Sequence, residues 1–74
     1  MSYTIYSKPS CPFCVRAKQL LDILGEEYTE INITEGDNRQ ALNEHLGYEA
    51  RTVPQIWHES KHIGGYTDLV EYTK

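Results

Sequence analysis

Two cysteines, the only ones in the chain, stand three positions apart as Cys11 and Cys14. A strand-like run at residues 3–7 precedes them, and Pro12 opens the helical pattern that follows. Side chains at positions i and i+3 of a helical turn lie on the same side. Their Cα atoms can fall within the roughly 4.4–6.8 Å that a disulfide needs. The pair can therefore open and close without a change of fold, which predicts redox chemistry.

Two structural interpretations compete with redox chemistry. A structural disulfide between residues so close in sequence would close a very short loop and restrain the unfolded chain little. A zinc site would combine the cysteines with His58 and His62, which also have ligand spacing. The stretch between the Cys pair and the His pair is much longer than the roughly 12–15 residues found in a zinc finger. We therefore expect no metal ligands in this chain.

The length and the charge of the chain exclude several classes of protein. Its 74 residues predict one domain, residues 1–74. It carries 7 lysines and arginines against 11 acidic residues, a net charge of −4, so nucleic acids and anionic membranes are disfavoured as partners. The N-terminal residues show neither a basic region nor a long apolar run, and we expect a cytoplasmic protein without a membrane span. In a reducing cytosol, Cys-x-x-Cys is more often catalytic or metal-binding than structural.

Local signals predict the elements around the cysteines. The first strand is expected at residues 3–7, and Cys11 occupies the N-cap position of a helix whose first residue is Pro12. Apolar residues then recur at helical spacing up to Gly25, a residue type that commonly ends helices. A second strand is expected at residues 28–33.

The second half of the chain predicts two more helices and a hairpin. Asp37 and Gln40 resemble a capping box that opens a helix over residues 38–46. Thr67 is expected to cap a last helix over residues 68–72. Between these helices, a hairpin is expected from two short strands, residues 55–58 and 62–63. The order β-α-β-α-β-β-α predicts an α/β fold, with a four-stranded mixed sheet flanked by three helices in a minimal thioredoxin-like layout.

Three segments together resemble the glutaredoxin family. They are Cys11-Pro12-Phe13-Cys14, Thr52-Val53-Pro54 and Gly64-Gly65-Tyr66-Thr67-Asp68. The resemblance runs nearly end to end and implies the glutaredoxin variant of the thioredoxin fold. It also implies a thiol–disulfide oxidoreductase of electron transport, with glutathione as co-substrate and no tightly bound cofactor. The expected partners are glutathione and disulfide-containing or glutathionylated proteins, and the expected state is a monomer.

The chemistry assigns different roles to the two cysteines. Cys11, at the mouth of the helix, is the predicted nucleophile, and Cys14, one turn further in, is the predicted resolving thiol. Lowering a thiol pKa by about three units requires roughly 4 kcal/mol. The helix dipole supplies only about 0.3–1 kcal/mol, or about 2 when partly buried. The N–H groups of Phe13 and Cys14 would therefore have to donate to the Cys11 sulfur, and Lys8 could add a favourable charge.

The resemblance also implies a glutathione site. Val53 can pair with the cysteinyl backbone, Pro54 in the cis form directs that backbone toward Cys11, and Thr67 and Asp68 suit the γ-glutamyl group. Lys8 and Gln40 are candidates for the glycyl carboxylate, and Arg39 or Arg51 could serve instead. The full set of expected substrate-binding residues is Lys8, Phe13, Gln40, Thr52, Val53, Pro54, Gly65, Thr67 and Asp68.

Two other functions stay open at this stage. Residues 1–6 and 46–48 also resemble NrdH-type redoxins, which thioredoxin reductase reduces and which serve ribonucleotide reductase. The Thr52-Val53-Pro54 and Gly64–Asp68 segments favour glutaredoxin over that family. Some glutaredoxins instead carry an iron–sulfur cluster between two protomers, ligated by the first cysteine and glutathione. Those proteins usually have Gly or Ser where this chain has Pro12, so the carrier function is disfavoured.

Overall fold

The computed structural model describes residues 2–74 and contains four strands and three helices in the predicted order. Met1, which belongs to the predicted domain and to the opening stretch compared with NrdH-type redoxins, lies outside the described residues. The elements are β1 (Ser2–Ser7), α1 (Pro12–Leu24), β2 (Glu27–Asn32), α2 (Asn38–Leu46), β3 (Gln55–His58), β4 (Lys61–Gly64) and α3 (Tyr66–Tyr72).

The sheet has the strand order β2-β1-β3-β4. β1 pairs in parallel with β2, because α1 returns the chain to the same end of the sheet, and antiparallel with β3. The hairpin β3–β4 is antiparallel, as its short connection requires. The mixed four-stranded sheet predicted from the sequence is confirmed, with β1 and β3 at its centre and β2 and β4 at its edges.

Helix α1 begins and ends where the sequence predicts. Cys11 is the N-cap, with extended backbone (φ −108°), and Pro12 occupies the first turn, where a missing N–H costs no hydrogen bond. Gly25 ends the helix in the left-handed region at φ 73°, which glycine adopts without steric cost. These two ends fix the Cys-x-x-Cys segment in the first helical turn, directly after the loop that leaves β1.

The helical bounds of α2 match the prediction, but its predicted capping box does not form. Asp37 makes no side-chain cap hydrogen bond, because its backbone (φ −96°, ψ 17°) is not in the extended conformation that a cap requires. Gln40 donates instead to the Glu44 carboxylate at 3.3 Å. The Asn38 amide holds the start of α2 by donating to the backbone carbonyl of Asn32 at 2.9 Å.

Helix α3 begins two residues earlier than predicted, and Thr67 is not its cap. Gly65 occupies the N-cap position, and the Asp68 carboxylate accepts the Gly65 N–H at 3.0 Å. Because an acidic side chain three residues into a helix can reach back to the first N–H, Asp68 performs the capping that we assigned to Thr67. No helix in residues 2–74 is long and apolar enough to cross a membrane.

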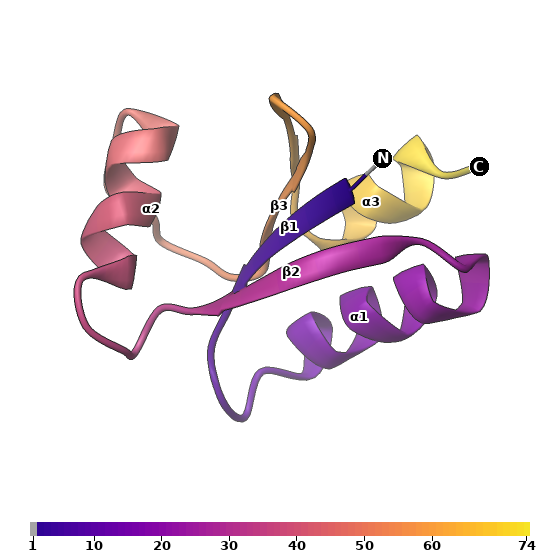
Figure 1. The fold of residues 1–74 in the computed structure, drawn as a ribbon, viewed down its shortest axis with the longest axis horizontal. Helices are drawn as coiled ribbons and strands as arrows, with labels where there is room; N and C mark the ends of the chain where they lie inside the picture. Colours follow the sequence, from indigo (N-terminus) through magenta and orange to yellow (C-terminus); the bar gives the residue numbers. More distant parts are fainter. Residues whose placement is uncertain (1) are drawn as a thin grey trace.

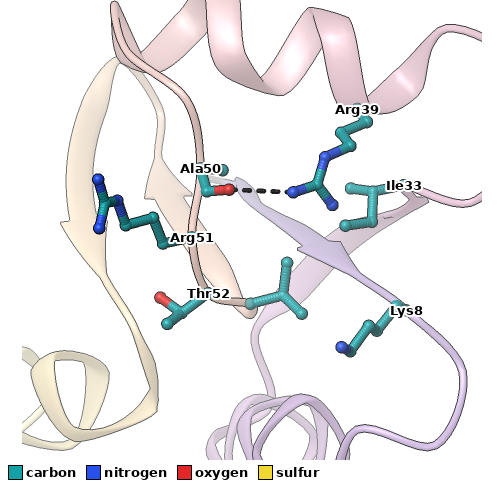
Figure 2. Close-up of a pocket in the computed structure, with 7 residues that line it drawn as sticks. Lys8, Ile33, Arg39, Ala50, Arg51 and Thr52 are labelled. Carbon is teal, nitrogen blue, oxygen red and sulfur yellow. Dashed lines mark hydrogen bonds between the residues drawn. The ribbon is translucent and has the colours of Figure 1, made fainter.

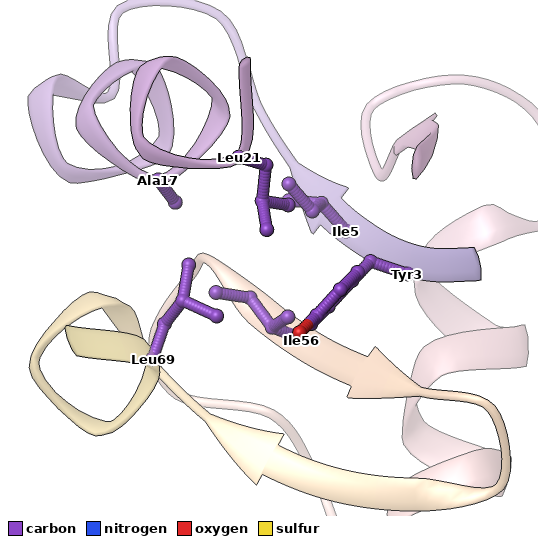
Figure 3. Packing of buried hydrophobic residues seen from close by; sticks show 6 residues of the cluster. All are labelled: Tyr3, Ile5, Ala17, Leu21, Ile56 and Leu69. Atoms are coloured by element: carbon purple, nitrogen blue, oxygen red, sulfur yellow. The ribbon is translucent and has the colours of Figure 1, made fainter. Parts of the chain in front are cut away.

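The two faces of the sheet bury separate clusters, because α1 and α3 cover one face and α2 covers the other (Figure 1). The α1/α3-face cluster (Figure 3) consists of Tyr3, Ile5, Ala17, Leu21, Ile56 and Leu69. The α2-face cluster consists of Tyr6, Ile33, Leu42, Ala50 and Trp57. Trp57 is 3% exposed, so the expectation that it belongs to the core is confirmed. Each fully buried aliphatic side chain contributes about 1.5–3 kcal/mol to stability.

Candidate active site

Cys11 and Cys14 are joined by a disulfide in the first turn of α1, with their Cα atoms 5.2 Å apart. Cys11 is 7% exposed and Cys14 is 1% exposed, so the cysteine nearer the helix mouth is also the more accessible one. The Cys14 N–H donates to the Cys11 sulfur at 3.2 Å. Among residues 2–74 no such bond comes from the Phe13 N–H, so only one of the two expected amide donors is in place.

The segment before β3 passes next to the cysteine pair. The Cys11 sulfur lies 3.6 Å from the Val53 carbonyl oxygen, and the Val53–Pro54 peptide bond is cis, as the resemblance implied. Pairing between β1 and β3 starts only at Gln55. Neither the N–H nor the C=O of Val53 bonds to another backbone group in the part of the chain that the structure describes. Both groups are therefore available to an extended chain bound beside Cys11.

A small cavity with cationic walls lies on one side of Val53. It has a volume of about 50 Å³ and is lined by Lys8, Ile33, Arg39, Ala50, Arg51, Thr52 and Val53. Figure 2 shows Lys8 and Arg39 extending toward the same hollow, whereas Arg51 extends from the opposite side of the chain segment that carries it. Arg39 donates to the Ala50 carbonyl oxygen at 3.1 Å, which fixes its guanidinium at the rim. Ligand pockets usually measure about 300–1,000 Å³, so this cavity fits one end of a ligand, such as a carboxylate.

A second cavity, of about 180 Å³, lies on the other side of Val53 and has an acidic end. Its lining is Phe13, Thr52, Val53, Pro54, Gly65, Tyr66, Thr67 and Asp68. The Phe13 ring is half exposed and packs against Tyr66 with ring centroids 6.1 Å apart. Because Thr52 and Val53 line both cavities, the two adjoin at these residues, and we refer to them together as the cleft, with a cationic end at Lys8 and Arg39 and an acidic end at Asp68.

Comparison with known proteins identifies the family to which this chain belongs. The glutaredoxin family model matches residues 3–63. The chain belongs to the glutaredoxin family. Glutaredoxin 1 of Salmonella typhimurium is 39% identical over 80 aligned residues, which cover 100% of this chain and 92% of that protein. Glutaredoxins are thiol–disulfide oxidoreductases, so this chain is an enzyme of that class and Cys11–Cys14 is its redox-active pair.

Two solved glutaredoxin structures share the fold. The structure of reduced Escherichia coli glutaredoxin superposes with a TM-score of 0.83 at 37% identity, covering 99% of this chain and 93% of that one. A buckwheat glutaredoxin–glutathione complex superposes with a TM-score of 0.80 at 33% identity, covering 96% of this chain and 66% of that one. The thioredoxin-like glutaredoxin fold predicted from the sequence is therefore confirmed.

The cleft of this glutaredoxin brings together all the expected substrate-binding residues except Gln40. Gln40 lines neither cavity, and its amide donates to Glu44 on the exposed side of α2. Its neighbour Arg39 lines the cationic cavity instead. Tyr66 also lines the cleft. The sequence gave no reason to select Tyr66 as a substrate-binding residue other than its place in the Gly64–Asp68 segment.

The histidines of this glutaredoxin do not form the metal site considered from their spacing. His58 stacks on Tyr3 on the α1/α3 face and shares a 2.6 Å hydrogen bond with the Tyr72 hydroxyl. His62 packs on Trp57, on the opposite face of the sheet. Within residues 2–74, no group of three or more His, Cys, Asp or Glu side chains is placed to hold a metal ion.

The loop that carries Cys11 is anchored at its start by Glu30. The Glu30 carboxylate accepts hydrogen bonds from the Lys18 ammonium at 2.8 Å and from the buried Ser7 hydroxyl at 2.6 Å. These two donors hold the pKa of Glu30 below its ordinary value. The contact ties the end of β1 to β2 and α1, and so fixes the point from which the active-site loop departs.

Proposed function

We propose that this glutaredoxin uses glutathione to reduce protein disulfides and glutathione mixed disulfides. The observation that carries the proposal is the position of the Cys11 sulfur beside the backbone of Val53, because Val53 lines both the cationic and the acidic cavity. A redox-active thiol at that point requires a substrate that presents its own sulfur while its ends reach both charged cavities. A short peptide with a central cysteine meets that requirement.

The chemistry of glutathione fits the two ends of the cleft. Its only ammonium lies at the γ-glutamyl end, where the Asp68 carboxylate offers a partner and the N–H of Thr67 can meet the adjacent carboxylate. Its glycyl end carries a carboxylate and no cation, which suits Lys8 and Arg39. The cysteinyl backbone between them can pair with Val53 as an added strand would. The buckwheat relative solved as a glutathione complex supports this assignment.

We assign the nucleophile to Cys11 and the resolving thiol to Cys14. Cys11 is the more exposed of the two, lies at the positive end of the α1 dipole and accepts the Cys14 N–H, and each of these features favours a thiolate. Cys14 lies underneath, within bonding reach of the Cys11 sulfur but screened from a protein substrate. The pair thus divides attack and release between two positions in one helical turn.

Exchange then proceeds through mixed disulfides. The Cys11 thiolate attacks one sulfur of a substrate disulfide, forming a Cys11–substrate disulfide and releasing the other substrate sulfur as a thiolate. The Cys14 thiolate attacks the Cys11 sulfur, which releases the second substrate thiolate and forms the Cys11–Cys14 disulfide. One glutathione thiolate reopens this disulfide to give a Cys11–glutathione disulfide and a free Cys14. A second glutathione attacks that mixed disulfide, forming oxidised glutathione and restoring the Cys11 thiolate.

A reductant-choice assay tests the proposal. The oxidised protein is supplied with glutathione and glutathione reductase, or with thioredoxin reductase, while NADPH consumption is followed on a glutathionylated substrate. We expect turnover with glutathione. Turnover only with thioredoxin reductase would overturn the proposal in favour of an NrdH-type redoxin, and ribonucleotide reductase would then be the first substrate to test. We expect this exchange to operate in a reducing cytoplasm, where glutathione keeps thiols reduced.

A further inference from the structure

The cationic end of the cleft has more positively charged side chains than the single glycyl carboxylate of glutathione can neutralise. Lys8, Arg39 and Arg51 line one cavity of a chain whose net charge is −4. No carboxylate of residues 2–74 lies within 4.0 Å of any of the three, because the salt bridges involve only Lys18 and Lys74. The single glycyl carboxylate of glutathione neutralises one charge. The remaining cations are left for a ligand that carries several negative charges at this end.

The backbone of Val53 sets the direction in which a substrate chain runs. A cysteine that uses both its N–H and its C=O on Val53 forms the hydrogen-bonded pair of an antiparallel ladder. Residues that follow this cysteine then run alongside Thr52, Arg51 and Ala50, toward the cationic cavity. Residues that precede it run past Pro54 toward Asp68. The charge of glutathione gives the same direction, because its ammonium end also falls at Asp68.

We propose that the preferred protein substrates of this enzyme carry acidic residues immediately after the cysteine that bonds to Cys11. The inference rests on the proposed function only through the use of Val53 as the pairing strand. Acidic side chains after that cysteine meet Lys8 and Arg39, whereas acidic side chains before it meet the Asp68 carboxylate. The same charges therefore attract one arrangement of a peptide and repel its reverse.

Two peptides of identical composition test the preference. One has the sequence Gly-Gly-Cys-Glu-Glu and the other Glu-Glu-Cys-Gly-Gly, both with blocked ends, and each is supplied as its symmetric disulfide dimer. Either sulfur of a dimer then has the same neighbours. The pre-reduced enzyme is mixed with each dimer without glutathione, and the reaction is quenched with acid and resolved by chromatography. Each rate is divided by the rate of the same dimer with free glutathione alone, which removes differences in thiol pKa.

We expect the peptide with trailing glutamates to react about five-fold faster at low salt, with the ratio approaching one near 0.5 M salt, where charges are screened within a few Å. Lys8→Gln and Arg39→Gln should each lower the ratio. Lys61→Gln is the matched control, because it removes the same charge at the β3–β4 turn, where Lys61 lies over the Tyr72 ring 5.1 Å away, and it should leave the ratio unchanged.

Three results would overturn the inference: equal normalised rates, a faster peptide with leading glutamates, or a preference that survives both Lys8→Gln and Arg39→Gln. None of them depends on the physiological reductant, because the reaction of the enzyme with each dimer contains no glutathione, which is used only in the separate reference reaction. Failure of the proposed function would instead appear in the reductant-choice assay. The two conclusions can therefore fail independently.

Discussion

The two faces of the sheet differ in composition and in what they contribute to the active site. The α1/α3 face is mainly aliphatic, and α1, whose first turn holds Cys11 and Cys14, packs on it. The α2 face is built around Trp57, on which His45 stacks with ring centroids 4.0 Å apart and His62 packs at 4.5 Å. Its helix has nine residues and no side-chain cap at its N-terminus.

The reacting sulfurs therefore lie on one face of the sheet, and Arg39, which is expected to bind negatively charged substrate groups, lies on the other. The sulfurs belong to a capped helix on the more extensive aliphatic cluster. Arg39 belongs to the shorter helix on the other face, and its guanidinium is fixed by one bond to the Ala50 carbonyl. The cleft lies where the two faces meet, at Thr52 and Val53. Changes on the first face should therefore remove catalysis or stability, and changes on the second should mainly alter selectivity.

The largest effect is expected within the cysteine pair itself. Cys11→Ser should lower every exchange activity by about 10³-fold or more, because a hydroxyl cannot replace the attacking thiolate. Cys14→Ser should abolish reduction of protein disulfides that need a resolving thiol, while removal of glutathione from mixed disulfides continues. Steady-state assays on both kinds of substrate measure the two outcomes. Retained activity in Cys11→Ser would refute the nucleophile assignment.

The next largest effect compares one buried leucine from each face. Leu21 and Leu42 are both 0% exposed, and replacing either with alanine should cost about 2–5 kcal/mol of unfolding free energy. Leu21→Ala should be the more damaging, because the short α2 can shift to fill the space left by Leu42. Urea denaturation measures both values. Ile23→Ala is the control on α1, since Ile23 is 82% exposed and should cost less than about 0.5 kcal/mol.

A glycine next to the Asp68 side chain should give an intermediate effect on stability. Gly64 has φ 121°, and a Cβ built on it would lie 2.8 Å from the Asp68 Cγ. Gly64→Ala should cost about 1–3 kcal/mol of stability and weaken glutathione binding, because the alanine is strained and displaces the Asp68 carboxylate. Denaturation and the glutathione KM measure the two effects.

Gly36→Ala provides the comparison for that variant. Gly36 also has a positive φ, 50°, but nothing lies within 4 Å of the position that its Cβ would take. It lies just before α2 and does not line the cleft. It should lose stability through backbone strain without a change in the KM for glutathione. An equal rise of KM in both variants would show that the effect at Gly64 does not act through Asp68.

The smallest effect concerns the pH response of the α2 face. Burial, and next the nearby charge of His45, lower the pKa of His62 below its ordinary value of 6.5, although Asp68 opposes the shift. The unfolded chain therefore takes up this proton at a higher pH than the folded protein does. The contribution of neutral His62 to the free energy of unfolding should be fully present above about pH 6.5 and should decrease slightly as the pH falls below that value. As the pH is lowered from 7.5 to 5.5, the melting temperature should fall less in His62→Gln than in the unsubstituted protein. The same dependence of melting temperature on pH in both proteins would contradict the assignment to His62.

Prediction from the sequence was most accurate where the signals are local. Cys11, Pro12 and Gly25 define the ends of α1 within a few neighbouring residues, and the structure follows them. Prediction was less definite where the partner is distant, and it failed where two residues compete for one role. The sequence left Gln40 and Arg39 both open for the glycyl carboxylate, and only Arg39 lines the cleft, because of the orientation of α2 over Ala50, which no local pattern specifies. Asp68 took the capping role from Thr67 because both residue types can cap a helix.

The edge position of β2 has a consequence for behaviour at high concentration. The outer side of an edge strand offers unpaired backbone groups to which a strand of another molecule can add. β2 carries the exposed Glu27, which forms no salt bridge within residues 2–74, so a second copy that paired along this edge with Glu27 opposite Glu27 would place like charges together. Such like-charge contact opposes edge-to-edge aggregation.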